Sequence, residues 1–316
     1  MRALSKFILA IFMAVGICGS ALAQYPDRPI TFLVGQTAGG GTDVFARLLA
    51  RYMEKYLSNA TISVINKPGA SGEFAFTDVA RAAPDGYTIG IINLPNAITQ
   101  VVTKDSTQFT LDDFTYLGRV YAGQASIVVP LQSPFKTVQD LVDFSKENPG
   151  VVTVAIGGLG ADDHLLALRF MKAAGIEFTL VPMGDGARAR NAVMGGHVSA
   201  GSMGLVDGYR FRDKLRTLGV MSDGRMSFAP DVPTFQEQGF DIVGGAVRVM
   251  AGPAGLPEDV KTSLAKAIEQ TAKDKEFLAE AEKLSSYVDY GTAEQAEAYV
   301  REQHKILSEL WASDPW

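Results

Sequence analysis

Apolar positions along the chain fall into two alternating patterns. Residues 30–34 (ITFLV) form a short, almost continuously apolar run, which predicts a strand buried in a parallel sheet. In residues 42–56 apolar side chains recur at helical spacing, which predicts a helix with one buried face. Because strand-like and helix-like segments keep alternating, we expect an α/β fold with parallel strands.

The same patterns continue to the end of the chain. Further strands are expected at residues 61–65, 87–92, 125–129, 152–156, 178–181, 198–200 and 246–250. Further helices are expected at residues 73–82, 137–147, 162–174, 187–194, 257–273 and 293–311. A chain of this length suits two domains of ordinary size.

The first residues have the three parts of a secretory signal. Arg2 and Lys6 supply positive charge, residues 7–17 are apolar, and Ala21-Leu22-Ala23 is a small-x-small cleavage site. The apolar run is shorter than the roughly 20 residues of a membrane span. We therefore expect residues 1–23 to be a cleaved signal peptide and the mature protein to be periplasmic, with an uncleaved membrane anchor as the alternative.

Removal of that segment changes the composition. The single cysteine, Cys18, is lost, so the mature chain is expected to lack disulfides and thiolate metal sites. Lys plus Arg falls from 29 to 27 against 35 Asp plus Glu, which moves the net charge from −6 to −8. An acidic chain with scattered basic residues is a poor nucleic-acid binder. We expect no nucleic-acid partner, no metal and no cofactor.

Two glycine-rich loops are the strongest candidates for binding. Residues 35–43 (GQTAGGGTD) follow a predicted strand and open a predicted helix, and residues 157–164 (GGLGADDH) repeat this arrangement in the second half. Free N–H groups at a helix start favour an anion. The alternative is a tight turn that binds nothing. A phosphate loop is disfavoured because Gly41 stands at its lysine position.

Two such loops in separate halves predict a ligand held between two lobes at strand ends. Within the second loop, Asp163 and His164 leave several roles open: helix capping, a ligand hydrogen bond, a metal site or acid–base chemistry. A serine hydrolase is disfavoured because neither serine-containing glycine turn, at residues 69–72 or 201–204, has the G-x-S-x-G pattern.

Several motifs together resemble the periplasmic receptors of tripartite tricarboxylate transporters, the Bug family. They are YPDRPI (25–30), AGGGTDVFARLLA (38–50), NKPGASGEFAF (66–76), APDGYT (83–88), SPFKTVQDLVDF (133–144), GGLGADDHL (157–165), PDVPTFQEQGF (230–240) and GPAGLP (252–257). The resemblance runs from Tyr25 to the C-terminal helix.

This resemblance implies a two-lobed, type II-like periplasmic binding protein. Each lobe would be a mainly parallel sheet flanked by helices, with the ligand in the cleft between the lobes. Residues 24–122 and 245–316 would build the first lobe, and residues 123–244 the second. Family members bind small carboxylates, commonly dicarboxylates, amino-acid carboxylates or citrate-like acids, so we expect a non-enzymatic receptor for a di- or tricarboxylate, an amino acid or an aromatic acid. They deliver them to a separate membrane permease, and we expect a monomer.

The family's binding residues can be placed on matching positions of this chain. The resemblance implies that the ligand is contacted by Ala38, Gly39, Gly40, Thr42, Asp43, Asn93, Asn96, Gly158, Gly160, Asp163, His164, Met183, Asp185 and Arg248. For Arg248 the two open interpretations are a bidentate pair with a ligand carboxylate and a surface ion pair.

The chain departs from the family pattern at Gly35-Gln36, Met183 and Asp162-Asp163. Negative charge beside an anion site weakens the binding of a polyanion, so a ligand with an amino or hydroxyl group facing Asp163 becomes plausible. Two other functions stay open: a co-receptor that presents ligand to a signalling kinase, and an envelope hydrolase or lyase that uses Asp163 and His164.

Overall fold

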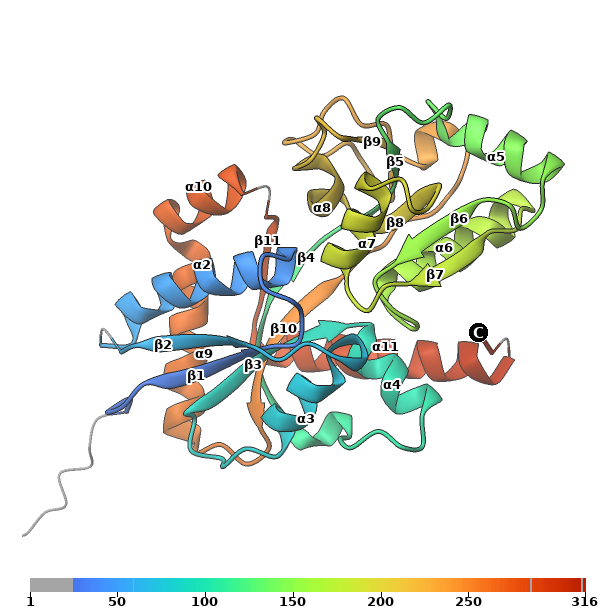
Figure 1. The fold of residues 1–316 in the computed structure, drawn as a ribbon. Coiled ribbons are helices and arrows are strands. Elements are labelled where there is room, and N and C mark those ends of the chain that lie inside the picture. The colour runs from blue at the N-terminus through green and yellow to red at the C-terminus, as the bar shows by residue number, and fades with distance from the viewer. Residues whose placement is uncertain (1–24, 59, 285, 314) are drawn as a thin grey trace, which may run out of the picture.

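The structure is a computed structural model that describes residues 25–58, 60–284, 286–313 and 315–316. The chain forms two lobes, each built around its own sheet with helices packed against it (Figure 1). This confirms the predicted two-lobed α/β fold. The predicted signal peptide, residues 1–23, lies outside the described residues.

The first lobe contains a six-stranded sheet in the order β11-β4-β10-β3-β1-β2. Its strands are β1 (Ile30–Val34), β2 (Ile62–Asn66), β3 (Thr88–Leu94), β4 (Phe114–Ala122), β10 (Val247–Pro253) and β11 (Val288–Gly291). Its helices are α2 (Gly41–Tyr56), α3 (Glu73–Ala80), α4 (Asn96–Thr103), α9 (Glu258–Lys273), α10 (Lys275–Lys283) and α11 (Ala293–Ser313), with the 3₁₀ turns η1 (Ala70–Gly72) and η2 (Leu111–Asp113).

The second lobe contains a five-stranded sheet in the order β7-β6-β8-β5-β9. Its strands are β5 (Ala125–Pro130), β6 (Thr153–Ile156), β7 (Thr179–Pro182), β8 (Ala200–Gly204) and β9 (Leu215–Val220). Its helices are α5 (Val138–Glu147), α6 (Asp162–Ala174), α7 (Gly186–Met194) and α8 (Leu205–Tyr209), with the 3₁₀ turn η3 (Gln236–Gln238).

Both sheets are mixed rather than mainly parallel. Strands β1, β2 and β3 pair in parallel, as do β6, β7 and β8. The antiparallel pairs lie where the chain passes between the sheets: β4 leaves the first sheet, β10 returns to it, and the two pair in opposite directions. The division of the lobes at residues 122/123 and 244/245 stays a prediction.

Strand β10 sets the position of Arg248. It lies between β3 and β4, and its register pairs Arg248 with Asn93 on one side and with Tyr121 on the other. All three residues are buried, near the ends of their strands. A central strand of the first sheet therefore carries a charged residue toward the second lobe.

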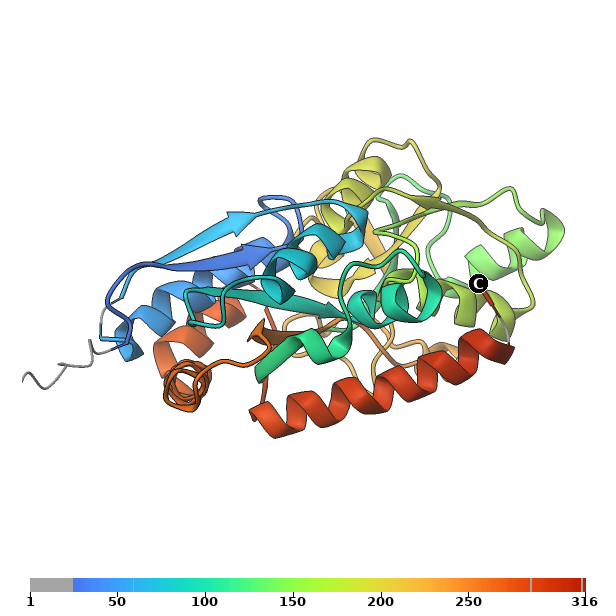
Figure 2. The same cartoon turned by 90° about the horizontal axis from the view of Figure 1, so that it is seen from below.

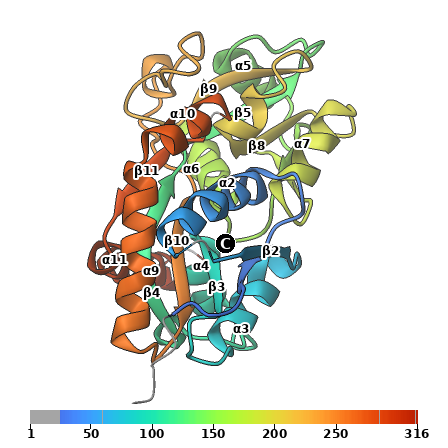
Figure 3. The same ribbon diagram turned by 90° about the vertical axis from the view of Figure 1, so that its left-hand side faces the viewer.

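Within the first lobe, helices are packed on the sheet by buried apolar side chains. Helix α2 buries Phe45, Leu49 and Met53 against the sheet, and Phe45 also meets Phe277 of α10 with ring centres 6.2 Å apart. Each such side chain contributes about 1.5–3 kcal/mol by leaving water. Helix α9 lies along the same lobe (Figure 3), where it packs against α2 and β4.

Six elements were missed by the periodicity argument: α4, β4, α8, β9, α10 and β11. Strand β4 contains Gly118 at φ +152° and a register shift against β10, so its side-chain alternation is broken. Helix α8 spans only five residues and β11 only four, which is too short for a periodic signal.

Helix α11 extends from the first lobe along the underside of the molecule, toward the second (Figure 2). Within the part of the chain that the structure describes, no helix combines the length and apolar character needed to span a membrane.

Candidate functional site

A small cavity lies between the two lobes. Its volume is about 90 Å³. The side chains and backbone around it come from the first-lobe loops, from β10 and from the strand–helix loops of the second lobe. The lining residues with polar side chains are Gln36, Thr42, Ser71, Asn93, Asn96, Tyr121, Gln124, Asp162, Asp163, Asp185, Asp207 and Arg248.

Arg248 is the unusual charge in this cavity. It is only 6% exposed, yet its Nε and Nη1 have no hydrogen-bond partner among the described residues. Its guanidinium carbon lies 3.7 Å above the ring centre of Tyr121, a cation–π contact that holds the group in place. Because Arg248 is buried, the surface ion pair considered above is excluded. Burying a guanidinium whose N–H groups lack acceptors costs free energy of folding, and a bound ligand that supplies the acceptor would offset this cost.

Neutral polar groups beside Arg248 are also incompletely bonded. The Nδ2 of Asn93 donates to the hydroxyl of Thr42 at 3.3 Å, while the Asn93 Oδ1 is buried without a partner among the described residues. The Oε1 of Gln36 is in the same condition. These two carbonyl oxygens can accept hydrogen bonds from a ligand that carries N–H or O–H groups.

The start of helix α2 is occupied by the protein's own carboxylates. Gly40, its N-cap residue, has no side chain that could cap the helix. The Asp43 carboxylate accepts hydrogen bonds from the Gly39 N–H at 2.8 Å and from the Arg47 Nε at 2.9 Å. Asp207, from α8 of the second lobe, faces the first turn: a Cβ built on Gly41 would lie 3.2 Å from its Oδ2.

Burial raises the pKa of Asp207, against the opposing effects of Arg190, Arg248 and the N–H of Gly41. Its closest cation is Arg190 on α7, whose Nη1 lies 3.5 Å from the Asp207 Oδ1. The Asp207 carboxylate is thus held between the second-lobe arginine and the first-lobe helix start.

At the start of helix α6, the side chain of Asp163 accepts hydrogen bonds from backbone N–H groups. One Asp163 oxygen accepts the N–H of Gly157, and the other accepts the N–H of His164 at 2.9 Å. Burial, with the neighbouring charge of Asp162, raises the pKa of Asp163 well above its usual range. Burial also raises the pKa of Asp162 to about 6, although Arg248 opposes this shift.

His164 has a structural partner. Its Nδ1 accepts the backbone N–H of Gly160 at 3.1 Å, and burial lowers the pKa of the imidazole. The side chain therefore stabilises the glycine loop as a neutral acceptor. Among the described residues, no group of three His, Cys, Asp or Glu side chains is arranged to hold a metal ion.

The second glycine loop also contacts the first lobe directly. The hydroxyl of Thr99, on α4, lies 2.8 Å from the carbonyl oxygen of Gly160 and 3.0 Å from that of Asn96, and it can donate to either. A Cβ on Gly158 would overlap the hydroxyl of Ser71, and one on Gly160 would lie 2.5 Å from the Thr99 Oγ1. These glycines permit the two lobes to approach each other.

The predicted site residues are therefore divided. Those that line the cavity are Thr42, Asn93, Asn96, Asp163, Asp185 and Arg248. Those outside its lining are Ala38, Gly39, Gly40, Asp43, Gly158, Gly160, His164 and Met183. Of the first set, Asp185 also caps α7 by accepting the N–H of Arg188 at 2.9 Å. Met183 packs beside the apolar cluster under α7 instead.

Sequence reasoning missed Ser71, Tyr121, Gln124, Arg190 and Asp207. Asp207 follows a glycine at a strand–helix junction, the same local signal that marked the two glycine loops, and could have been found in that way. Tyr121 and Arg190 have no such local signal, since their neighbours in the site come from distant parts of the chain.

A larger apolar groove of about 950 Å³ lies between α6 and α11. Its apolar side chains include Leu165, Leu166, Met171, Ile306, Leu307, Leu310 and Trp316. The small interlobe cavity is the better candidate for a polar ligand because, among the described residues, the Nε and Nη1 of Arg248 and the side-chain oxygens of Asn93 and Gln36 there have no hydrogen-bond partner.

Residues 45–310 match the family model described as tripartite tricarboxylate transporter family receptor. The chain belongs to this receptor family. It is 32% identical over 242 residues to a UPF0065 protein in the gbd 5' region of Cupriavidus necator, covering 76% of this chain and 73% of the relative. It is 29% identical to Protein BugT of Bordetella pertussis, covering 85% and 84%.

Solved structures agree with the fold of the receptor. The periplasmic binding protein BugD superposes with a TM-score of 0.84 at 28% identity, covering 92% of this chain and 98% of BugD. Two proteins of Rhodopseudomonas palustris share the fold: one solved with adipate (TM-score 0.86, 22% identity, covering 91% and 97%) and MatC with bound malate (0.83, 24%, covering 90% and 99%).

Proposed function

We propose that this receptor captures a small carboxylate in the interlobe cavity and delivers it to the membrane permease of a tripartite tricarboxylate transporter. The periplasm is the corresponding location, supported by the family and by the signal-like N-terminus. The observation that carries the proposal is Arg248, a buried guanidinium whose Nε and Nη1 have no partner among the described residues. A carboxylate is the anion that matches this fork of donors.

In this proposal the ligand carboxylate binds Arg248 rather than the two helix starts. Asp207 faces the start of α2, and Asp163 accepts a backbone N–H at the start of α6, so a carboxylate of the protein already lies at each helix start. The rest of the ligand lies near Asp162 and the free oxygens of Asn93 and Gln36. These groups favour N–H or O–H donors, and an ammonium group satisfies them best.

The volume of the cavity limits the size of the ligand. One water-sized group needs about 10–15 Å³ of such a volume, so about 90 Å³ accepts roughly six to nine non-hydrogen atoms. Small amino acids, hydroxy acids and acid amides fit this range. Of the acids in the two R. palustris structures, malate has nine non-hydrogen atoms and reaches the upper end of this range, whereas adipate has ten and exceeds it.

A binding role also accounts for the residues that suggested an enzyme. The carboxylate of Asp163 and the imidazole of His164 both bond to backbone N–H groups, and neither bonds to the other side chain. This arrangement fixes the loop and leaves no paired acid and base for turnover. It supports a receptor without enzymatic activity.

A ligand screen tests the proposal. The purified mature protein is heated with 3-aminopropanoate, succinamate, alanine, lactate, malate, succinate or citrate, and hits are measured by calorimetry. A ligand present at 100 times its Kd adds about 2.7 kcal/mol to the free energy of unfolding. We expect shifts with small acids that carry a donor group and none with citrate. If none of these acids shifts the melting temperature, the proposal is wrong.

Delivery needs a separate measurement. The ligand-loaded receptor is offered to the membrane permease reconstituted in vesicles, and uptake of the labelled ligand is followed. We expect uptake only when receptor and permease are both present. Binding without any uptake would favour the role of a ligand-presenting co-receptor.

A further inference from the structure

The contact between Asp207 and helix α2 joins residues that belong to different lobes. Asp207 lies on α8 of the second lobe, while Gly41 is the first residue of α2 in the first lobe. A Cβ on Gly41 would lie 3.2 Å from one Asp207 oxygen and 3.3 Å from the other. Both carboxylate oxygens therefore face the helix start, where free N–H groups and the helix dipole favour a negative charge.

Among the described residues of the first lobe, no side chain caps this helix start. The N-cap residue, Gly40, has no side chain to offer, and the Asp43 carboxylate is engaged with Gly39 and Arg47. On its own side, Asp207 is held by Arg190 at 3.5 Å, and its side chain is 15% exposed. The carboxylate is thus positioned from the second lobe to complete a helix of the first.

We propose that Asp207 acts as an internal substitute for a ligand carboxylate. With the lobes closed it occupies the anion position at the start of α2, links the two lobes, and excludes a second anionic group from this end of the cavity. This inference rests on the proposed function, because it assumes that the ligand's single carboxylate binds Arg248. It assigns Asp207 the role of a specificity-determining residue.

The consequence for ligands follows from charge. Asp162, Asp163 and Asp207 all line the cavity, and each of them that is ionised repels a ligand carboxylate in this poorly solvated site. A dianion must place its second carboxylate among these three acids, whereas a neutral amide of the same shape need not. The receptor is therefore expected to prefer monoanions or zwitterions.

The deciding experiment compares two isosteric acids, succinate and succinamate, by calorimetry at pH 7.5. The wild-type protein is expected to bind succinamate at least tenfold more tightly. In Asp207→Asn this preference is expected to fall by at least tenfold, with Asp207→Ala as a second variant. Asp213→Asn, an exposed carboxylate nearby in the second lobe, is the charge-matched control and should keep the wild-type preference.

A second control separates charge selection from lobe closure. Thr99→Val removes the hydroxyl that reaches Gly160 across the lobes, so it should weaken both acids by the same factor and leave their ratio unchanged. An unchanged ratio in both Asp207 variants would overturn the assignment, as would an equal loss of ratio in Thr99→Val.

A measurement without ligand makes the two proposals separable. Small-angle X-ray scattering of the free proteins should show a larger radius of gyration for Asp207→Ala than for wild type and Asp213→Asn. If the Asp207 variants open but none of the seven screened acids binds any form, the lobe-linking role is supported and the proposed ligand class is wrong. If they neither open nor change the ratio, Asp207 has no such role and Arg248 can still bind a carboxylate.

Discussion

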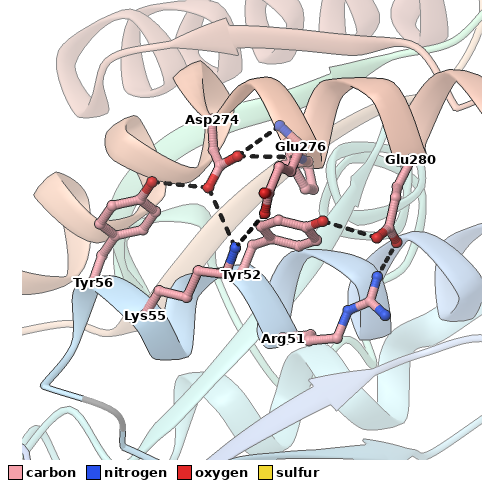
Figure 4. Close-up of polar contacts among 8 residues, drawn as sticks. Arg51, Tyr52, Lys55, Tyr56, Asp274, Glu276 and Glu280 are labelled. Carbon is pink, nitrogen blue, oxygen red and sulfur yellow. Dashed lines mark hydrogen bonds and ion pairs between the residues drawn. The ribbon is translucent and has the colours of Figure 1, made fainter.

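The charged side chains near the two ends of helix α2 differ in whether they have partners. At its C-terminal end lies a polar cluster in which Arg51, Tyr52, Lys55 and Tyr56 meet acidic side chains of α10 and of its N-cap residue, Asp274, and each group has a partner (Figure 4). At its N-terminal end, the interlobe cavity contains Arg248, whose buried Nε and Nη1 lack hydrogen-bond partners among the described residues.

The polar cluster at the C-terminal end of α2 lies within the first lobe and is largely open to solvent. The Tyr56 hydroxyl lies 2.9 Å from Asp274, and the Tyr52 hydroxyl lies 2.9 Å from Glu280. Arg51, Lys55, Glu276 and Glu280 have side chains 40–75% exposed, so water competes with their ion pairs, whereas the Asp274 side chain is 11% exposed. Such pairs contribute little to stability. The comparison sets exposed paired charges, which position a helix, against the buried Arg248 guanidinium, which we propose binds a ligand carboxylate.

The largest expected effect comes from removing the buried charge. Arg248→Ala should weaken the best small acid by at least about 30-fold, because truncating one partner of a buried charge pair costs at least about 2 kcal/mol. Arg248→Lys should recover only part of the loss, since an ammonium cannot replace the two-pronged contact. Arg51→Ala, in the polar cluster, should bind normally. Calorimetry on all three variants checks this, and equal losses for Arg248→Ala and Arg51→Ala would contradict it.

A smaller loss is expected when the lobes are kept apart. An Ala at Gly160 would place its Cβ 2.5 Å from the Thr99 Oγ1 across the lobes, so we expect about a tenfold loss of affinity. Gly175→Ala is the matched control: it also has positive φ, +63° against +75°, but no atom within 4 Å. Both variants should lose similar stability, about 1 kcal/mol, and only Gly160→Ala should lose affinity. Parallel denaturation and binding curves test this pair.

The pH dependence of stability provides the next effect. The pKa of Asp162 is about 6 in the folded protein against 3.8 for a free side chain, so the folded form holds the proton more tightly. The contribution of this group to stability is therefore present below about pH 4 and is lost as the pH rises to about 6. One pKa unit corresponds to about 1.4 kcal/mol.

Urea denaturation of wild type and Asp162→Asn at pH 4 to 7 measures this. The difference in unfolding free energy between the two should change in favour of the variant over that interval and be constant above it. A difference independent of pH would show that Asp162 ionises normally.

The smallest effect is expected in the polar cluster. Tyr52→Phe removes the hydroxyl that donates to Glu280 and should lower the free energy of unfolding by about 0.5–1.5 kcal/mol, the usual value of one hydrogen bond. Ligand affinity should not change. A loss of affinity in Tyr52→Phe would mean that the two ends of α2 are coupled.

The local pattern predicted several elements well. Strand β1 and helix α6 have the predicted bounds, and α2 begins one residue earlier than expected. Each has a periodicity long or apolar enough to be recognised from neighbours in the chain. The placement of Arg248 was left between two interpretations, because a single strand position does not reveal which strands will flank it.

From the order of amino acids came the export-like N-terminus, the alternation of strands and helices, the two glycine loops and the family motifs, all of which depend on residues close together in the chain. The tertiary structure decided which charges meet. It brought Asp207 to the start of α2, stacked Arg248 on Tyr121, and turned the glycine loops toward the opposite lobe. These contacts join residues that are distant in sequence, and their energies depend on burial and on lobe closure, which no local pattern encodes.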